Sequence, residues 1–317
     1  MIVSITHEHD LDGLGSQAII KRYFDNSTVK EEMEFLDATY SNFVDVMKRL
    51  FNSNKSLTQL IISDIGFNKS FNVLFKLFKV AKKTNCRILW FDHHIVDVSV
   101  KRKISKLIDV YINDIEKCAA EIMKEYFLPD DSVAIKIAEF ARDTDFKTEI
   151  YPMAADIQMI IGYNLGAEGF KNRRKIVQLL SEGWFKDPWF DTQIQELENW
   201  INEESRYAIQ HAKCVNINEF GDVYISYAKI GGGRITQILE KEYPDSQAYI
   251  GIDLRYNEII IHSKSVQCRE FARYFSGGGH EDRAGFKHPQ PFKEDLQLSD
   301  KFIEDITKIL PKYKKRD

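Results

Sequence analysis

Short apolar runs alternate with longer helical patterns through the first two-thirds of the chain, and this alternation is the strongest constraint on its fold. Residues 2–5, 59–63 and 87–91 have the pattern of buried strands, and residues 34–36 are a weaker candidate. Helical patterns fall between them, at residues 15–24, 43–51 and 70–84. Strands separated by helices favour a parallel sheet with helices on both faces. Such sheets bind ligands beyond the carboxyl ends of their strands.

The second half of the chain predicts a different arrangement. Helical patterns at residues 117–126 and 131–142 precede a charged amphipathic stretch, 191–211, which contains no glycine or proline and is typical of a connecting helix. The remaining patterns predict strands at 223–228, 247–254 and 258–262, with helices at 234–242 and 268–275. At 317 residues two domains are expected. We therefore predict an α/β protein with an N-terminal parallel-sheet domain at 1–188, a helical linker at 189–212 and a smaller mixed α/β domain at 213–317.

Charge and cysteine usage exclude several classes of protein. The net charge of −4 argues against a protein that binds long nucleic acid through a broad positive surface. The four cysteines contain no CxxC pair, so neither a zinc ribbon nor a disulfide framework is indicated. The first ten residues include carboxylates and histidines, and no apolar run approaches the roughly 20 residues that span a bilayer. These features predict a cytoplasmic protein that does not enter the membrane.

Acidic and imidazole side chains follow three of the predicted strands. His7-Glu8-His9-Asp10-Leu11-Asp12 follows the first strand, Asp64 follows residues 59–63, and Asp92-His93-His94 follows residues 87–91. A lone Asp-Leu-Asp-Gly is more often a turn or a helix cap than a ligand site. The same chemistry at three strand ends favours a functional site at one rim of the sheet instead.

These residue types indicate a site for divalent metal ions. Imidazole nitrogens and carboxylate oxygens bind such ions, and a carboxylate can bridge two of them. We expect two ions about 3.5–4 Å apart, the spacing used for in-line displacement at phosphorus. Ligation without thiolate favours manganese and leaves magnesium, cobalt and zinc open. The predicted ligands are His7, Asp10, Asp12, Asp64, His93 and Asp143.

The chain resembles the DHH phosphoesterase family, which is named for the triplet found here as Asp92-His93-His94. Residues 7–13, Asp64 and Asp143 match further motifs of that family. The resemblance implies that Asp64 bridges the two ions, with His7 and Asp10 on one side and Asp12, His93 and Asp143 on the other. It also implies two catalytic residues outside the ligand set: Asp92 orients the site and His94 faces the phosphate.

Two ligand positions have rivals. His7 is separated from Asp10 by two residues, a spacing that differs from the common family variants, so His9 competes for its role. Asp145 competes with Asp143, because two residues further along an extended segment it reaches the same side. We favour Asp143, since an Asp-Thr pair after an apolar helix most resembles the family motif.

A glycine run near the C-terminus predicts a second contact with the substrate. In Ser276-Gly277-Gly278-Gly279-His280 the missing side chains let backbone N–H groups approach an anion, although such runs are also common as plain turns. Followed by Ala284-Gly285, the run resembles the DHH-associated C-terminal domain. That resemblance implies nucleotide or short-oligonucleotide binding by Gly277, Gly278, Gly279, His280, Arg283 and Lys264.

Two other clusters have competing interpretations. Gly231-Gly232-Gly233 opens a predicted helix, where either anion binding or a simple turn is consistent with the pattern. The basic run Lys171-Asn172-Arg173-Arg174-Lys175 can contact RNA, but a solvated helix face is the favoured interpretation.

The predicted activity is a two-metal phosphodiesterase or phosphatase acting on short RNA or DNA oligonucleotides or phosphorylated nucleotides. Within the family, compact two-domain length favours a short-RNA exonuclease, with 3′-phosphoadenosine 5′-phosphate as a second substrate. The alternatives are a cyclic or linear dinucleotide phosphodiesterase, a single-strand DNA exonuclease, and a nucleotide-binding sensor with weak catalysis. A homodimer is a candidate assembly.

Overall fold

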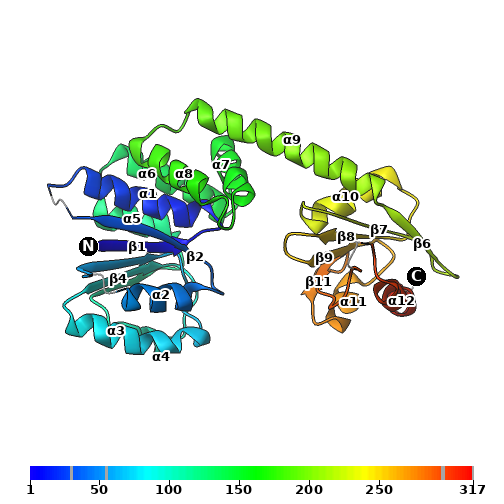
Figure 1. The fold of residues 1–317 in the computed structure, drawn as a ribbon, viewed down its shortest axis with the longest axis horizontal. Coiled ribbons are helices and arrows are strands. Elements are labelled where there is room, and N and C mark those ends of the chain that lie inside the picture. Colours follow the sequence, from blue (N-terminus) through cyan, green and yellow to red (C-terminus); the bar gives the residue numbers. More distant parts are fainter. Residues whose placement is uncertain (29–30, 54–55, 294–296, 316–317) are drawn as a thin grey trace. The chain divides into compact units, whose positions relative to one another are not determined.

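The computed structural model describes residues 1–28, 31–53, 56–293 and 297–315. The described residues form two compact units, Met1–Gln195 and Glu196–Asp317. The boundary between them falls within the long helix α9 (Pro188–Gln210) (Figure 1). Within the residues that the structure describes, no helix combines the length and apolar character needed to cross a membrane.

The described part of the N-terminal unit contains a five-stranded sheet in which all strands are parallel, as the sequence predicts. The order is β2-β1-β3-β4-β5. The strands are β1 (Ile2–His7), β2 (Met33–Ala38), β3 (Gln59–Ser63), β4 (Arg87–Asp92) and β5 (Val110–Asn113). Strand β5 was not predicted from the sequence. It is only four residues long and lies at the edge, where it pairs with β4 alone.

Helices cover both faces of this sheet. Figure 1 shows α1, α5, α6 and α8 on one face and α2, α3 and α4 on the other. Their bounds, with that of α7, are α1 (Leu11–Asp25), α2 (Phe43–Asn52), α3 (Leu74–Lys83), α4 (Val98–Ile104), α5 (Ala119–Phe127), α6 (Ser132–Asp145), α7 (Pro152–Tyr163) and α8 (Phe170–Glu182). The first part of the predicted helix 70–84 is instead a 3₁₀ segment, Lys69–Val73.

Alternation along the strands divides the apolar core into two layers. In β3, Leu60 and Ile62 pack in the layer of α2 and α3, while Ile61 packs in the layer of α1. Successive strand residues point to opposite faces, so a strand buried on both sides is apolar throughout. The continuous run Leu60-Ile61-Ile62 therefore has a direct structural cause.

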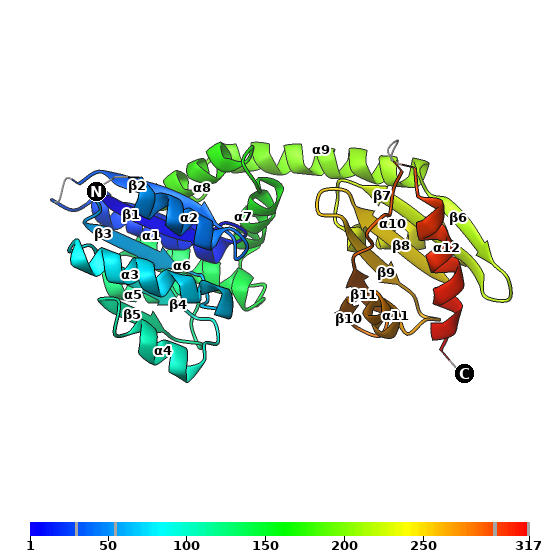
Figure 2. The ribbon, with the colours of Figure 1, turned by 60° about the horizontal axis from the view of Figure 1, so that its bottom comes forward.

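The described C-terminal unit contains a six-stranded mixed sheet, which agrees with the predicted mixed α/β class. The order is β10-β11-β9-β8-β7-β6, and only the β7–β8 pair is parallel. The strands are β6 (Lys213–Ile217), β7 (Gly221–Ala228), β8 (Ala248–Asp253), β9 (Glu258–His262), β10 (Gly278–Gly279) and β11 (Arg283–Phe286). Figure 2 shows the helices of this unit, which are α10 (Gly232–Glu242), α11 (Cys268–Tyr274) and α12 (Asp300–Ile309), the last followed by a 3₁₀ turn at Leu310–Tyr313.

One member of the Gly231-Gly232-Gly233 cluster, Gly232, has a packing role in this unit. A Cβ atom on Gly232 would lie 2.6 Å from the carbonyl oxygen of Gly251, so glycine lets α10 approach β8 closely. Glycine at such a position is explained by backbone contact without any ligand.

Candidate metal centre

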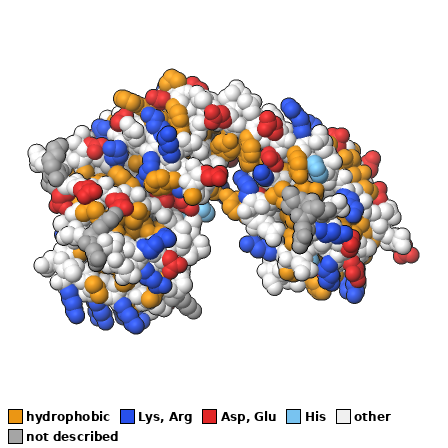
Figure 3. Space-filling model, viewed as in Figure 1, with side chains coloured by type: hydrophobic (Ala, Val, Ile, Leu, Met, Phe, Trp, Pro, Cys, Tyr) orange, Lys and Arg blue, Asp and Glu red, His pale blue; other side chains and the backbone are white. Residues whose placement is uncertain are grey.

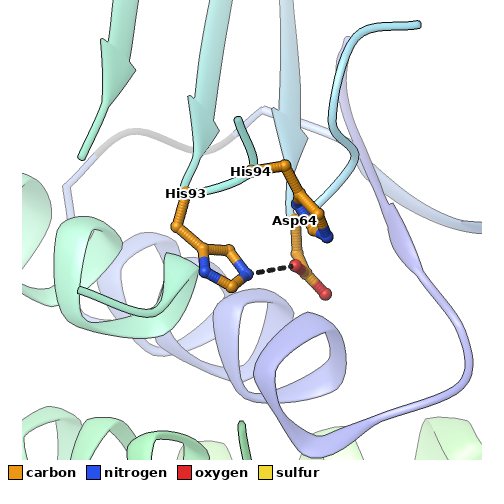
Figure 4. Close-up of side chains that lie close together, drawn as sticks. All are labelled: Asp64, His93 and His94. Carbon is orange, nitrogen blue, oxygen red and sulfur yellow. Dashed lines mark ion pairs between the residues drawn. The ribbon is translucent and has the colours of Figure 1, made fainter. Parts of the chain in front are cut away.

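The carboxyl ends of three adjacent strands bring the predicted ligands together. His7 ends β1, Asp64 follows β3, and His93 and His94 follow β4. Because β1, β3 and β4 are neighbours in the sheet, these residues meet at one edge. Figure 4 shows Asp64, His93 and His94 close together there. In the described residues, three groups of side chains have ligand atoms within 4.8 Å of one another. They are Asp64, His93 and His94; His7, Asp10 and Asp64; and Asp12, His93 and Asp145.

Asp64 is shared between two of these groups, and its two oxygens face different histidines. Its Oδ2 lies 3.9 Å from Nδ1 of His7, and its Oδ1 lies 3.4 Å from Nε2 of His93. The same His93 nitrogen is 3.6 Å from Oδ2 of Asp12. A carboxylate in this position between two groups of candidate ligands is the one expected to bridge two ions.

The burial of several carboxylates at this edge fits a cation site. Asp64 is 2% exposed, and its Oδ2 has no hydrogen-bond partner in the described structure. Burial, reinforced by the charges of Asp10 and Asp12, raises the pKa of Asp64 well above its ordinary value. Burial also raises the pKa of Asp12 to about 7, although the backbone N–H groups of Ala119 and Ala120 donate to its carboxylate. A buried carboxylate cluster is stabilised when a cation neutralises it, so these residues fit hard divalent ions.

The first motif, residues 7–13, includes the start of helix α1. The Asp10 carboxylate accepts a hydrogen bond from the Gly13 N–H at 2.9 Å and caps α1. Its other oxygen lies 2.9 Å from Nδ1 of His7. A Cβ atom on Gly13 would lie 2.1 Å from the His7 carbonyl oxygen, so glycine is required where the helix begins. Asp10 therefore combines a capping role with a position in the ligand cluster.

Asp92 and His94 form a pair beside the cluster. Nδ1 of His94 lies 2.8 Å from Oδ1 of Asp92, and this hydrogen bond raises the pKa of His94. Asn113, at the end of β5, donates to Oδ2 of Asp92 at 3.2 Å and to the His94 carbonyl oxygen at 2.9 Å. The sequence prediction missed Asn113 because it did not include β5. The available signal was a polar residue that ends the short apolar run Val110-Tyr111-Ile112.

The structure brings Asp145, not Asp143, to the cluster, which reverses the preference drawn from the sequence. Oδ2 of Asp145 lies 3.6 Å from Nδ1 of His93. The Asp143 carboxylate instead accepts hydrogen bonds from Thr148 Oγ1, Ile150 N–H and Tyr151 N–H. Both aspartates belong to α6, so the assumption of an extended segment was wrong. Residues two apart on a helix point about 200° apart, and only one can face the site.

The choice between His7 and His9 also has a geometric basis. His7 shares a group with Asp10 and Asp64. His9 is half-exposed, and its Nε2 lies 3.9 Å from Oε1 of Glu8. The position of His7 therefore favours it as the ligand.

The predicted substrate-binding glycines form a hairpin in the C-terminal unit. Gly278 and Gly279 pair with Gly285 and Ala284, and the N–H of His280 donates to the Arg283 carbonyl oxygen at 2.7 Å. Gly279 has a φ of 142°, and a Cβ on Gly277 would lie 2.1 Å from the Gly285 carbonyl oxygen.

Lys264 lies beside this hairpin, because its neighbour Ser263 donates a backbone hydrogen bond to Asp282 in the hairpin turn. The Lys264 Nζ pairs with Glu240 at 3.1 Å. Packing alone accounts for two of the three glycines, and substrate contact by this region stays a prediction.

The basic run at residues 171–175 is not a solvated helix face, so that prediction is wrong. Arg173 is 2% exposed and pairs with Glu8 at 2.7 Å and with Asp37 at 2.9 Å. Arg174 also pairs with Asp37. These two arginines join α8 to β2 and to the first motif.

Comparison with known proteins identifies the N-terminal region. Residues 1–154 match the model of the DHH family, N-terminal domain, and this range contains every residue of the cluster. No curated protein matches the sequence. A solved DHH domain from a member of the s1p family of ribosomal proteins has a TM-score of 0.51 at 13% identity, over 98% of this chain and 87% of that one. This similarity concerns the fold alone.

Two further solved structures are similar at lower scores. An uncharacterized protein from Helicobacter pylori G27 has a TM-score of 0.45 at 16% identity, over 98% of this chain and 99% of that one. Exonuclease RecJ bound to manganese has a TM-score of 0.47 at 12% identity, over 97% of this chain and 88% of that one. The family match and the cluster at the strand ends lead to one identification: residues 1–154 of this chain are a DHH family N-terminal domain.

Proposed function

We propose that this protein is a metal-dependent phosphoesterase that hydrolyses short oligonucleotides, with 3′-phosphoadenosine 5′-phosphate as a second substrate. The DHH domain and the cluster of imidazoles and carboxylates support the general class. The observation that carries the proposal is Asp64, a buried carboxylate that has one oxygen without a hydrogen-bond partner and has a histidine near each of its oxygens.

The cluster divides into two ligand sets for two divalent ions, with manganese the first candidate and magnesium or cobalt the alternatives. His7, Asp10 and Asp64 would hold one ion, while Asp12, Asp64, His93 and Asp145 would hold the other. When bound, two such ions supply an activated water and neutralise charge on the phosphate. In this assignment Asp145 replaces Asp143.

His94 is proposed to stabilise negative charge on the phosphate. Asp92 holds Nδ1 of its ring, which leaves Nε2 as the nitrogen able to face a substrate oxygen. The same hydrogen bond favours the protonated ring, the form that donates to an anion. Asp92 and Asn113 keep the ring and its backbone in place.

Selection of short substrates is proposed to involve the C-terminal hairpin. His280 is exposed at the turn, and Arg283 starts the strand that follows. Both side chains can donate hydrogen bonds to a phosphate remote from the reacting one.

A substrate panel tests this function. Purified protein is incubated with manganese, magnesium, cobalt or EDTA, and with RNA and DNA of about two, five and twenty nucleotides, 3′-phosphoadenosine 5′-phosphate, cyclic dinucleotides and pyrophosphate. We expect mononucleotide products from two- and five-nucleotide RNA with manganese, and none with EDTA or with the Asp64→Asn variant. Faster degradation of the long DNA would favour a single-strand exonuclease, and nucleotide binding without any product would favour a sensor.

A further inference from the structure

A pocket of about 620 Å³ lies in the N-terminal unit between α2 and the start of α8. Val46, Arg49 and Leu50 line it from α2, and Phe170 lines it from α8. Leu36 of the edge strand β2 also lines it. Its volume falls within the range of small-ligand sites, which is about 300–1,000 Å³.

The pocket is adjacent in the chain to the candidate metal centre. Glu8, which lines it, directly follows the candidate ligand His7. Asp37, another lining residue, stands opposite Thr6 in the pairing of β2 with β1. Two lining residues are therefore neighbours, along the chain or across the sheet, of residues near the edge where the cluster lies.

Arg173 pairs with two of the acidic residues that line the pocket. Its guanidinium pairs with both Glu8 and Asp37 and also donates to the carbonyl oxygens of Asn164 and Gly166. These contacts fix the wall formed by Glu8 and Asp37 before any ligand binds. They also reduce the repulsion that these two carboxylates would exert on an anionic ligand, although Glu34 adds a third carboxylate to the lining.

Arg49, which lines the pocket from α2, provides a second positive charge. It is exposed on α2, and no acidic side chain within the described ranges pairs with it. Its guanidinium keeps all its donors for a ligand and is suited to phosphate, which it can bind in a bidentate manner.

The lining also contains apolar side chains, including a partly exposed aromatic ring. Phe170 is 43% exposed, and the Arg174 guanidinium lies 5.2 Å from its ring centroid. Leu36, Val46 and Leu50 provide aliphatic surface. Figure 3 shows acidic, basic and apolar side chains interspersed over this unit, with lysines and arginines gathered instead where Figure 1 places α3 and α4. An aromatic ring, aliphatic walls and one free guanidinium suit a nucleoside that carries a phosphate.

We propose that this pocket binds the nucleoside next to the reacting phosphate, with the base against Phe170 and a neighbouring phosphate on Arg49. The identity of the ligand rests on the proposed function. Stacking on an aromatic side chain is tolerant of base identity, so the pocket would select for a nucleotide without reading its sequence.

Binding measurements test the pocket separately from catalysis. A fluorescein-labelled dinucleotide and adenosine 5′-monophosphate are titrated into the full chain carrying Asp64→Asn, and into the same chain with Phe170→Leu or Arg49→Ala added. We expect each added change to weaken binding, Phe170→Leu by about 5- to 150-fold, the range of base–aromatic stacking. Phe170→Trp keeps an aromatic ring and is expected to retain affinity. Trp184→Leu and Arg102→Ala are matched controls outside the pocket and the cluster, and are expected to bind normally.

Two results separate this proposal from the proposed function. If the wild-type protein hydrolyses oligonucleotides while Phe170→Leu and Arg49→Ala bind the probes with unchanged affinity, the pocket is not the nucleoside site. If Phe170→Leu lowers affinity but the wild-type protein hydrolyses no member of the substrate panel, the pocket assignment stands and the enzymatic proposal fails. Failure of the Asp64→Asn parent to bind either probe also overturns the pocket assignment.

Discussion

Replacing Asp143 and Asp145 separately by asparagine distinguishes a structural carboxylate from a metal-binding one. One Asp143 oxygen accepts from Thr148 Oγ1 at 2.5 Å and from Ile150 N–H at 2.8 Å, and the other accepts from Tyr151 N–H at 2.9 Å. Asparagine has only one acceptor oxygen, so its amide group would face one of these donors. Loss of a hydrogen bond to a charged group costs about 1.5–3 kcal/mol. We expect Asp143→Asn to lower the free energy of unfolding by this amount in the metal-free protein.

The pH dependence of this loss gives a second test. Burial raises the pKa of Asp143, but its hydrogen bonds outweigh burial and hold the pKa below the ordinary value. A carboxyl group with a depressed pKa stabilises the fold above its unfolded pKa of about 4, and this contribution is lost as the pH falls through the folded value. The difference in stability between wild type and Asp143→Asn is therefore largest near neutral pH and shrinks in acid.

Asp145→Asn is expected to change metal affinity and to leave metal-free stability nearly unchanged. Its side chain is 30% exposed and lies 3.6 Å from Nδ1 of His93, where burial and the charge of Asp10 raise its pKa. We expect a change in metal-free stability within about 0.5 kcal/mol, as for other changes that break no buried contact. Manganese affinity is expected to fall at least about tenfold, the lower end of the loss caused by changes next to metal ligands.

Two measurements on the same proteins complete the comparison. Urea unfolding in EDTA between about pH 3 and 8 reports the stability of each variant, and calorimetric titration with manganese reports affinity. Loss of manganese affinity in Asp143→Asn, with normal affinity in Asp145→Asn, would refute the reasoning and restore the sequence-based preference.

Four further tests address the metal centre and the recognition of substrate. Asp64→Asn is expected to abolish hydrolysis and thermal stabilisation by manganese, while its metal-free circular dichroism matches that of wild type. His7→Ala is expected to lower manganese occupancy measured by elemental analysis, with His9→Ala as the neutral comparison; the reverse result transfers the ligand role to His9. Because burial raises the pKa of Asp12 to about 7, manganese binding near pH 6 is expected to release protons and to strengthen as pH rises, and calorimetry giving equal heats in buffers of different ionisation enthalpy would contradict this. His280→Ala is expected to lower kcat/KM more for a dinucleotide than for bis-p-nitrophenyl phosphate, whereas equal losses would assign His280 to the chemical step.

The sequence by itself determined the parallel sheet and the edge where the ligands gather. Buried strands such as Leu60-Ile61-Ile62 leave a continuous apolar signal, and helical patterns between them require parallel crossovers. Polar residues that follow adjacent parallel strands must meet at one edge, so His7, Asp64 and His93 could be grouped without coordinates. Strand β5 was not predicted, because a four-residue edge strand gives an apolar pattern too short to identify.

Only the tertiary structure decided which member of a nearby pair faces the site. Asp143 and Asp145 have similar sequence surroundings, and their roles separate because α6 continues to Asp145 and turns the two side chains about 200° apart.

The burial of Arg173 in the basic run at residues 171–175 likewise depends on the tertiary structure. Arg173 pairs with Asp37, 136 residues earlier, and with Glu8, 165 residues earlier. A local charge pattern indicates a solvated face because burial of a lone charge is costly. Here the ion pairs with Asp37 and Glu8 offset that cost. Both residues are far from Arg173 in the sequence, so the local charge pattern could not indicate them.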